Sequence, residues 1–570
     1  MPGYYRNPIL PGFNPDPSIC RVGKDYFLVT SSFEFFPGIP IYHSTDLVKW
    51  TLIGHAITRR TQVDMRTVES GAGLWAPTIR YNDCDGKFYV TTGCMYRFRI
   101  PDVVPARGFY VSTDNIWEAG SWSDPVHFDN IGIDQELFFD DDGKTYLSVG
   151  NRIITETIER RGFDTGIYLS EIDLTTGRTL TDPLLLRAST LGIGVAEGPH
   201  IYKRDGYYYL SSAEGGTDSG HQQWIFRSKS IYGPYTPGPR NPILFNRNGS
   251  ALENTGHMDF VEGPDNNWWA VFLAIRPLFD QNDDGKKFNS PLGRETSLAP
   301  VEWVDGWPVV NGGKQVELIG QAEGLDLIEE PKEWNADFSA SGREADLPLG
   351  WYSLRTPMKK CYSLTERPGH LTIYGAAYTL NDDESPSLLL QRQTLLSMDW
   401  TTELQFDPQI VGQEAGTCVW LSRDAYASIG ISMTAEGRHV VVRYPNKERN
   451  GFEVGSVFAH PTRRYALGKR SNFRPFLWWQ IESATIPETG PIVLAIKARP
   501  FFYSLHFSIA TASTSTLTND LATVSTQLFT NKNGPSFTGT HFGLYAQGFG
   551  RKPCLTPAYF SRAGWKAVVK

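Results

Sequence analysis

Three carboxylates of this 570-residue chain lie in surroundings that are unusual for acids at a protein surface. Asp16 lies between two prolines in NPDPS, Asp134 lies in GIDQELFF, and Glu197 lies in VAEGPHIY. Small and apolar residues surround each of them, whereas a solvated acid more often belongs to a charged run. Carboxylates can act as general acids and bases, but an aspartate between prolines is also a common turn residue, so both interpretations are open.

The three acids precede units of a repeat that occupies the first half of the chain. Five times, a turn rich in Gly, Asp or Asn leads into an aromatic strand: GKDYFLVTSS, DGKFYVTTG, DGKTYLSVG, DGYYYLSSA and DNNWWAVFL. The equivalent aromatic positions 27, 89, 146, 208 and 269 are 57 to 62 residues apart. A second aromatic signal follows each of the first four strands with a similar spacing, at 42, 110, 168 and 226.

This repeat predicts one four-stranded antiparallel sheet per unit, because a single sheet needs neighbours to bury its faces. Five sheets closed into a ring form a five-bladed β-propeller, in which strand starts surround a central channel. Acids at the starts of three blades would then meet in one pocket. Their joint recurrence favours a functional interpretation over turn capping.

The repeat stops after LAPVEWVDGWPVVN, and a polar connector at 312–331 follows. Beyond it, alternating runs such as LTIYG, GTCVWLS, HVVVRY and IVLAIKA predict a β-sandwich. We therefore expect an all-β chain with a propeller at 1–320, which would carry any catalysis, and an accessory sandwich at 321–570.

Composition excludes several classes of partner. The net charge of −8 argues against nucleic acids and polybasic membrane binding. Six cysteines without a CxxC pair indicate neither a zinc site nor a disulfide scaffold, although one Cys84–Cys94 bridge is conceivable. No signal peptide is visible, so an intracellular chain and a processed secreted chain are both compatible. The sequence does not indicate an oligomeric state.

Long ordered motifs between about residues 6 and 311 resemble glycoside hydrolase family 43, and more narrowly its two-domain β-xylosidase/α-L-arabinofuranosidase branch. They include NPILPGFNPDPSICRVGKDYFLVTSSFEFFPGIPIYHSTDLVKW, GLWAPTIRY, VAEGPHIYKRDGYYYLSSAEGG, TGHMDFVE and LGRETSLAPVEWVDGWPVVN. The second half resembles the concanavalin-like sandwich of that branch more weakly, chiefly in SFTGTHFGLYA. The resemblance implies a five-bladed propeller, in agreement with the repeat.

The resemblance also implies roles for the three acids. Asp16 would be the general base, Glu197 the general acid, and Asp134 the residue that orients Glu197 and tunes its pKa. Family members invert the anomeric centre. Inversion needs one carboxylate to activate water and an opposite carboxyl group to protonate the leaving oxygen, ~6.5–9.5 Å apart. A negative Asp134 would help Glu197 to hold its proton near neutral pH.

Further residues match substrate-binding positions of the family. Arg294 in LGRET would hydrogen-bond the terminal sugar, although a salt bridge with Glu295 or another acid is the alternative. Phe33 and Trp75 would form aromatic walls of the pocket, although aromatic residues in strands ordinarily belong to a core. Phe537 would close the pocket from the sandwich.

His257 matches a histidine that in some relatives contacts a metal through water. A structural calcium ion is therefore one hypothesis, and a merely hydrogen-bonded histidine is the other. No cofactor is required for the reaction that the resemblance implies.

The sequence departs from the family pattern in two places. Gln135 and Glu136 follow Asp134 where relatives usually carry small residues, so an extra acid is expected near the pocket. His541 occupies a position where a second aromatic residue is common. We take these changes to indicate a remodelled entrance that could admit branched xylan.

The expected function is exo-acting, inverting hydrolysis that removes terminal α-L-arabinofuranosyl and/or β-D-xylosyl groups from arabinoxylan or xylo-oligosaccharides. The departures favour arabinofuranosidase activity, and β-D-xylosidase as the main activity is the alternative. Retaining chemistry, as in fructan-cleaving propellers, and a non-catalytic sugar-binding propeller are the other hypotheses.

Overall fold

A computed structural model of the chain describes residues 3–96, 106–153, 164–192, 194–263, 267–281, 284–322, 331–339, 346–445, 479–509, 519–530 and 537–568. These residues form β-strands, turns and two 3-10 helices, at Asn311–Gly313 and Thr526–Phe529, without an α-helix. The chain divides into two compact units. The first is Met1–Phe279 with Arg294–Glu329, and the second is Asp280–Gly293 with Glu330–Lys570.

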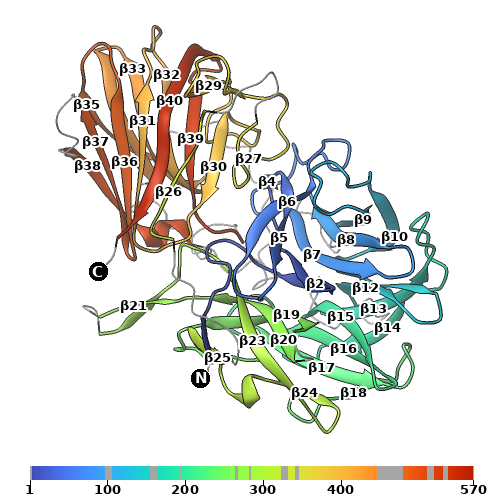
Figure 1. Ribbon diagram of the computed structural model, residues 1–570. Coiled ribbons are helices and arrows are strands. Elements are labelled where there is room, and N and C mark those ends of the chain that lie inside the picture. Colours follow the sequence, from blue (N-terminus) through green and yellow to red (C-terminus); the bar gives the residue numbers. More distant parts are fainter. Residues whose placement is uncertain are drawn as a thin grey trace, which may run out of the picture. The chain divides into compact units, whose positions relative to one another are not determined.

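The first unit is a propeller of five four-stranded antiparallel sheets (Figure 1). The strands of the first two blades are β2 (Ser18–Val22), β3 (Asp25–Val29), β5 (Gly38–Ser44) and β6 (Thr51–Ile57), then β7 (Gly73–Asn82), β8 (Lys87–Met95), β9 (Arg107–Thr113) and β10 (Val126–Ile131). Those of the third and fourth are β11 (Ile133–Phe139), β12 (Thr145–Arg152), β13 (Thr165–Ile172) and β14 (Leu184–Ala188), then β15 (Ala196–Arg204), β16 (Tyr207–Glu214), β17 (Gln222–Ser228) and β18 (Thr236–Pro237). The fifth blade consists of β19 (Glu253–Glu262), β20 (Trp268–Ile275), β23 (Glu295–Val304) and β24 (Trp307–Val310).

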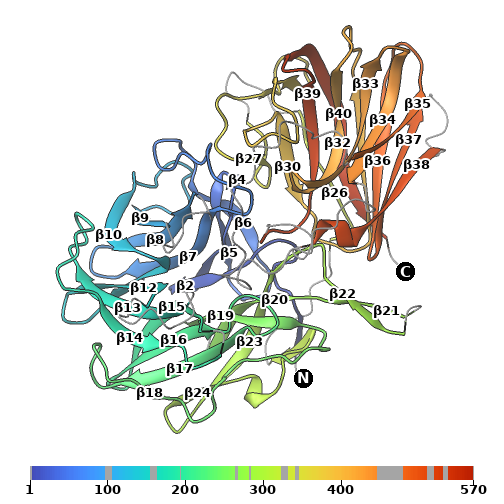
Figure 2. The same cartoon turned by 180° about the vertical axis from the view of Figure 1, so that it is seen from behind.

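The predicted repeat corresponds to these blades, because its five aromatic segments form the second strand of each sheet. The first strands β2, β7, β11, β15 and β19 contact one another in a closed ring, and four of them are labelled near the middle of the propeller in Figures 1 and 2. Aromatic rings fill the spaces between blades. Phe27 packs on Phe88 with ring centroids 5.0 Å apart, and Tyr89 packs on Phe139 at 5.1 Å. Much of the aromatic excess is therefore structural.

The N-terminal segment pairs with a strand that follows the fifth blade. β1 (Gly3–Arg6) pairs with β25 (Ile319–Ala322), the strand in which the expected domain boundary falls. The Asn7 side chain donates to the Leu298 carbonyl at 3.0 Å and accepts from its N–H at 2.8 Å. The N-terminal segment is thereby fixed to the fifth blade.

The second unit is a β-sandwich of two antiparallel sheets. One sheet has the order β28-β29-β40-β31-β36-β37-β38, with β26 also paired to β40, and the other runs β35-β34-β33-β32-β39-β30-β27. Their bounds are β26 (Glu333–Asn335), β27 (Tyr352–Leu354), β28 (Tyr362–Ser363), β29 (Leu371–Gly375), β30 (Leu388–Arg392), β31 (Met398–Gln405), β32 (Gln413–Ser422), β33 (Ala425–Thr434), β34 (Gly437–Pro445), β35 (Trp479–Thr485), β36 (Ile492–Arg499), β37 (Phe502–Ile509), β38 (Asn519–Ser525), β39 (His541–Gly548) and β40 (Cys554–Ala567). Three short strands remain in the chain, β4 (Phe35–Phe36), β21 (Leu278–Asp280) and β22 (Lys286–Phe288).

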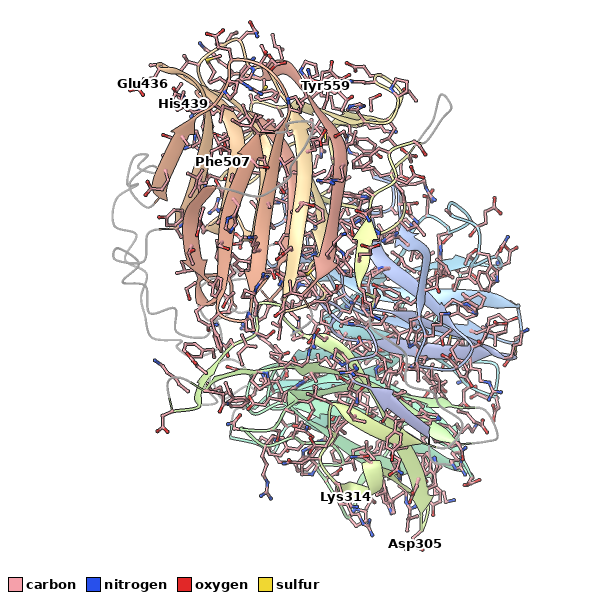
Figure 3. The ribbon with its side chains drawn as sticks, turned by 60° about the vertical axis from the view of Figure 1, so that its left-hand side comes forward. Asp305, Lys314, Glu436, His439, Phe507 and Tyr559 are labelled. Atoms are coloured by element: carbon pink, nitrogen blue, oxygen red, sulfur yellow. The ribbon has the colours of Figure 1, made fainter. Side chains whose placement is uncertain are left out.

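One hydrophobic core lies between the two sheets of the sandwich. Phe507 of β37, labelled in Figure 3, belongs to it. Trp400 stacks on Phe542 with ring centroids 5.2 Å apart, and its indole N–H donates to Thr417 Oγ1 at 2.8 Å. The alternating apolar pattern of the second half thus predicts the sandwich correctly.

All six cysteines are free, so the conceivable Cys84–Cys94 bridge does not form. Cys84 is exposed and Cys94 is buried. Among the residues that the structure describes, no helix has the length and apolar character needed to cross a membrane.

Candidate active site

The inner strand of every blade has the same backbone feature near its start. At equivalent points of the five blades lies a residue with a positive φ: Asp16 (53°), Ala76 (37°), Asp134 (57°), Gly198 (55°) and His257 (50°). In β7, β11, β15 and β19, the strand register shifts at this point. Such bulges redirect side chains and often occur at functional sites. The predicted acids, Trp75 and His257 all lie at or beside this position, which the sequence alone did not reveal.

Asp16 is buried and accepts two short hydrogen bonds. Its Oδ1 accepts from Arg294 Nη1 at 2.7 Å, and its Oδ2 accepts from Ser31 Oγ at 2.6 Å. Ser31 Oγ in turn accepts from the backbone N–H of Ala76 in the second blade, at 2.6 Å. The carboxylate is therefore held from three blades, and its orientation is fixed before any substrate binds.

Arg294 forms a salt bridge, which is the second of the two interpretations considered for it, but its partner is Asp16. Glu295 pairs instead with Arg276, at 2.7 Å and 2.8 Å. Arg294 also donates to Thr217 Oγ1 at 3.2 Å. Arg294 is thus part of the acid cluster, and its contact with a sugar stays a prediction.

Phe33 and Trp75 lie together beside this ion pair. Their ring centroids are 5.7 Å apart, and the Arg294 guanidinium lies 5.5 Å from the centroid of the Phe33 ring. Backbone hydrogen bonds between Phe33 and Leu74 connect the first two blades, at 2.9 Å and 3.1 Å. Phe33 is almost fully buried, so it also serves the core. The predicted aromatic wall is therefore adjacent to Asp16 and Arg294.

Glu197 is adjacent to a direct link between the third and fourth blades. The backbone N–H of Gly198 donates to Asp134 Oδ2 at 2.8 Å. Burial, followed by the negative charges of Asp134 and Asp16, raises the pKa of Glu197 to about 8, although Arg294 opposes this shift. Burial also raises the pKa of Asp134. Glu197 can thus keep its proton at neutral pH, as a general acid must.

His257 is buried between Gly198 and His200. A Cβ atom on Gly198 would lie 2.9 Å from His257 Nδ1, and the His257 and His200 ring centroids are 6.2 Å apart. Among the described residues, no group of three or more His, Cys, Asp or Glu side chains is arranged to hold a metal ion. We derive no catalytic step from calcium, and its binding through water stays a prediction.

At Glu136 and His541, the two departures from the family pattern, the structure differs from the expected remodelling of the pocket entrance. Glu136 is fully buried, and its Oε1 lies 2.5 Å from Arg80 Nη2 while its Oε2 accepts from the Ile201 N–H at 2.8 Å. It is committed to these partners, so it does not add a free acid to the pocket.

His541 is buried in β39, where burial lowers its pKa to about 3. Phe537 precedes β39 in the second unit, and its role in closing a pocket stays a prediction.

Sequence reasoning missed Ser31, Thr217 and His221. His221 is buried, and its Nδ1 lies 3.0 Å from the Asn254 carbonyl oxygen. Burial, together with the charge of Arg294, lowers its pKa to about 4. Serine, threonine and a single histidine carry no distinctive sequence signal, and only the fold brings them to Asp16 and Arg294.

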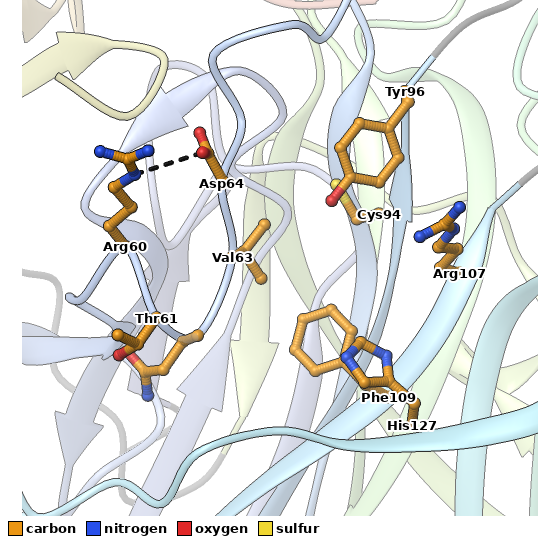
Figure 4. A pocket seen from close by; sticks show the side chains of 10 residues that line it. Arg60, Thr61, Val63, Asp64, Cys94, Tyr96, Arg107, Phe109 and His127 are labelled. Carbon is orange, nitrogen blue, oxygen red and sulfur yellow. Dashed lines mark hydrogen bonds and ion pairs between the residues drawn. The ribbon is translucent and has the colours of Figure 1, made fainter. Parts of the chain in front are cut away.

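A separate cavity of about 240 Å³ is lined by residues of the second blade and of the loop after β6 (Figure 4). Arg60 on one side is paired with Asp64 at 3.2 Å. Burial raises the pKa of the Cys94 thiol to about 12, so this thiol is not a ready nucleophile. The cavity contains none of the predicted site residues, and it does not compete with the acid cluster as a catalytic site.

Comparisons with known proteins agree with this geometry. Residues 5–308 match the family model "Glycosyl hydrolases family 43", and residues 337–468 and 477–566 match "Beta xylosidase C-terminal Concanavalin A-like domain". A non-reducing end alpha-L-arabinofuranosidase of Bacteroides ovatus is 37% identical over 96% of this chain and 92% of its own length. A xylan 1,3-beta-xylosidase of a Vibrio species is 36% identical over 76% of this chain and 81% of its own length.

A solved structure extends the comparison to the whole fold. A xylan beta-1,4-xylosidase from Bacillus halodurans has a TM-score of 0.82 and 29% identity, over 99% of this chain and 100% of that one. The family model that matches the propeller identifies it as a glycosidase domain, and its acid cluster contains a carboxylate held by arginine and a second acid whose pKa is raised to about 8. The chain belongs to glycosyl hydrolase family 43.

Proposed function

We propose that this glycosidase acts from chain ends, with inversion, and releases terminal α-L-arabinofuranosyl and/or β-D-xylosyl groups from arabinoxylan or xylo-oligosaccharides. The observation that carries the proposal is the contrast between the two acids. Asp16 is hydrogen-bonded by Arg294 and Ser31 as a carboxylate, whereas the surroundings of Glu197 favour its protonated form.

These two states are the ones that inversion requires. Asp16 would accept a proton from water as the water oxygen attacks the anomeric carbon. The glycosidic bond would break, and Glu197 would give its proton to the leaving oxygen. Asp134 would hold the Gly198 backbone, and with it the position of Glu197, while its charge supports the protonated state.

We further propose that arabinofuranosidase is the main activity. The Bacteroides ovatus relative, which aligns over nearly the whole chain, is an alpha-L-arabinofuranosidase. β-D-Xylosidase is the competing main activity, since the Vibrio and Bacillus halodurans relatives are xylosidases. Family membership favours both over a non-catalytic sugar-binding propeller.

A two-substrate assay tests the proposal. We expect kcat/KM for 4-nitrophenyl α-L-arabinofuranoside to exceed that for the β-D-xyloside, and arabinose release from arabinoxylan to exceed xylose release from xylobiose. The reverse order in both comparisons would replace arabinofuranosidase by xylosidase. Proton NMR of the first product formed distinguishes inversion from retention, because a retaining enzyme would initially release the sugar with the anomeric configuration of the substrate.

A further inference from the structure

A second layer of polar side chains follows the acid cluster along the same five inner strands. It lies two residues after the positive-φ position in β2, β11, β15 and β19, and four residues after it in β7. One residue per blade belongs to it: Ser18, Arg80, Glu136, His200 and Asp259. The layer therefore repeats the arrangement of the acid cluster with different chemistry.

Arg80 is the residue that joins this layer. Its Nη2 lies 2.5 Å from Glu136 Oε1, and its Nη1 lies 2.8 Å from Asp259 Oδ2. The same guanidinium donates to Ser18 Oγ at 3.2 Å and lies 3.1 Å from His200 Nδ1. One side chain of the second blade thus contacts all four other blades.

The Glu136 and Asp259 carboxylates, which pair with Arg80, also accept hydrogen bonds from the backbone. Glu136 accepts from the Ile201 N–H at 2.8 Å, four residues after Glu197. Asp259 accepts from the Ile19 N–H at 3.0 Å, three residues after Asp16, and from Tyr202 OH at 2.6 Å. The strands that carry both catalytic acids are therefore held through carboxylates that Arg80 pairs.

The two buried carboxylates of this layer need a positive charge beside them. Both carboxylates are fully buried, and Arg80 pairs with each of them, while His200 Nδ1 also lies 3.3 Å from Glu136 Oε1. Breaking a buried ion pair leaves an uncompensated charge, and fixing a register is the best-attested use of such pairs. The planar fork of arginine suits this bridging role better than the point charge of lysine.

We propose that Arg80 is a positioning residue, which fixes the register of the inner strands so that Asp16, Asp134 and Glu197 face one another correctly. This inference rests on the proposed function, because it concerns the same acid cluster. Arg80 acts through Glu136 and Asp259 and need not touch the substrate.

A positioning role for Arg80 predicts a changed pH dependence of the enzyme, which a purely structural role does not. The charged groups that act on Glu197 are Asp134, Asp16, Glu214 and Arg294. His257 lies beside Gly198, and its charge also acts on Asp134. If the strands loosen, Asp134 and Glu197 separate, water enters, and Glu197 loses its proton at lower pH.

The test is Arg80→Lys, which keeps a positive charge and removes the fork. We expect kcat to fall about tenfold or more while KM changes less than about threefold, since misplaced catalytic groups chiefly affect the chemical step. We also expect the basic limb of the kcat/KM profile to move to lower pH by about half a unit.

The matched control is Arg443→Lys in the sandwich. Arg443 Nη2 lies 2.7 Å from Glu414 Oε2, and the side-chain exposures of 16% and 0% resemble the 18% and 0% of Arg80 and Glu136. A comparable fall in Tm is expected for both variants, with a changed basic limb in Arg80→Lys alone. Unchanged kcat and an unmoved limb in Arg80→Lys would overturn the inference.

Two further measurements keep the test decisive. If Arg80→Lys does not fold, Tyr202→Phe removes the hydroxyl that donates to Asp259 Oδ1 and accepts from the Phe260 N–H. The same downward movement of the limb is expected, and an unmoved limb would reject the role. If the wild-type chain hydrolyses neither pentoside, the proposed function fails independently. The Glu197 carboxyl pKa, measured by ¹³C NMR with Glu197→Gln as the assignment control, then decides whether Arg80→Lys lowers it, as positioning requires.

Discussion

The backbone N–H of Gly198 donates a hydrogen bond to Asp134 Oδ2 across 2.8 Å, which ties the third blade to the fourth beside Glu197. Asp134 therefore acts on Glu197 in two ways. It fixes the neighbouring backbone, and its negative charge raises the pKa of the Glu197 carboxyl. An asparagine at 134 would keep a hydrogen-bond acceptor and lose the charge, so the two effects can be separated.

Asp134→Asn is expected to shift the pH profile of the enzyme. The wild-type kcat/KM should fall as pH rises through about 8, because Glu197 then loses the proton that the leaving group needs. In Asp134→Asn this basic limb should move to lower pH, because a nearby negative charge has been removed. Asp140→Asn, in the same blade but paired with Lys203, is the control and should leave the limb in place. A limb that moves upward in Asp134→Asn would contradict the assignment.

Glu197→Gln should affect stability in a pH-dependent manner. The native pKa of Glu197 is raised to about 8 from an ordinary value of 4.5, so the native state binds the proton more tightly than the unfolded state. The stability of the wild type therefore falls as pH rises between these values, whereas glutamine stays neutral. We expect the Tm of the variant, relative to wild type, to be higher at pH 8 than at pH 4. A Tm difference that is constant between pH 4 and pH 8 would contradict the raised pKa.

Asp16→Asn should lower kcat by about 10² to 10⁴, since the amide cannot accept the proton of the attacking water. Ser31→Ala serves as the graded comparison, because it removes the hydroxyl that donates to Asp16 and accepts from the Ala76 N–H, each at 2.6 Å, and leaves the base in place. We expect a loss of about tenfold for it. Hydrolysis of the aryl arabinofuranoside measures both, with circular dichroism to verify folding. Wild-type rates in Asp16→Asn would exclude this residue as the base.

Gly198→Ala should lose activity as well as stability. The residue has a φ of 55°, and a Cβ atom there would lie 2.9 Å from His257 Nδ1, so both the backbone and the neighbouring ring must adjust. The matched control is Gly206→Ala, whose φ is 73° but whose nearest neighbour is Lys229 Nζ at 3.7 Å. Each should lower stability by about 1 kcal/mol or more through the left-handed backbone. Only Gly198→Ala should lower kcat, and equal kcat in the two variants would argue against the crowding at His257.

The sequence was sufficient for the architecture because propeller blades repeat their local pattern. Aromatic strands recur with the period of the fold, and the alternating second half contains the sandwich pattern. The three acids could be singled out for the same reason, since each precedes a repeat unit. His257 lies at the equivalent position and Trp75 lies beside it, but neither is an acid, so their correspondence appears only in the backbone angles of Ala76 and His257.

Other features depend on contacts through space that no local pattern encodes. Asp16 and Arg294 are 278 residues apart, and their ion pair follows from closing the ring. Glu136 was expected to be an additional acid near the pocket, but Arg80, 56 residues earlier in the chain, pairs with it in the interior. Sequence context cannot distinguish a buried, compensated carboxylate from an available one when its partner belongs to another blade.

The pairing of β1 with β25 has a consequence for synthesis on the ribosome. Gly3 pairs with Ala322, so this pairing cannot form until the segment that contains β25 has left the exit tunnel. At an earlier stage, before β19 and Arg294 have left the tunnel, the inner strand of the first blade lacks its fifth-blade neighbour, and Asp16 lacks its ion-pair partner. Contacts of such high sequence separation form late and slowly. The nascent chain therefore acquires the Asp16–Arg294 ion pair only after nearly all of the propeller has been translated.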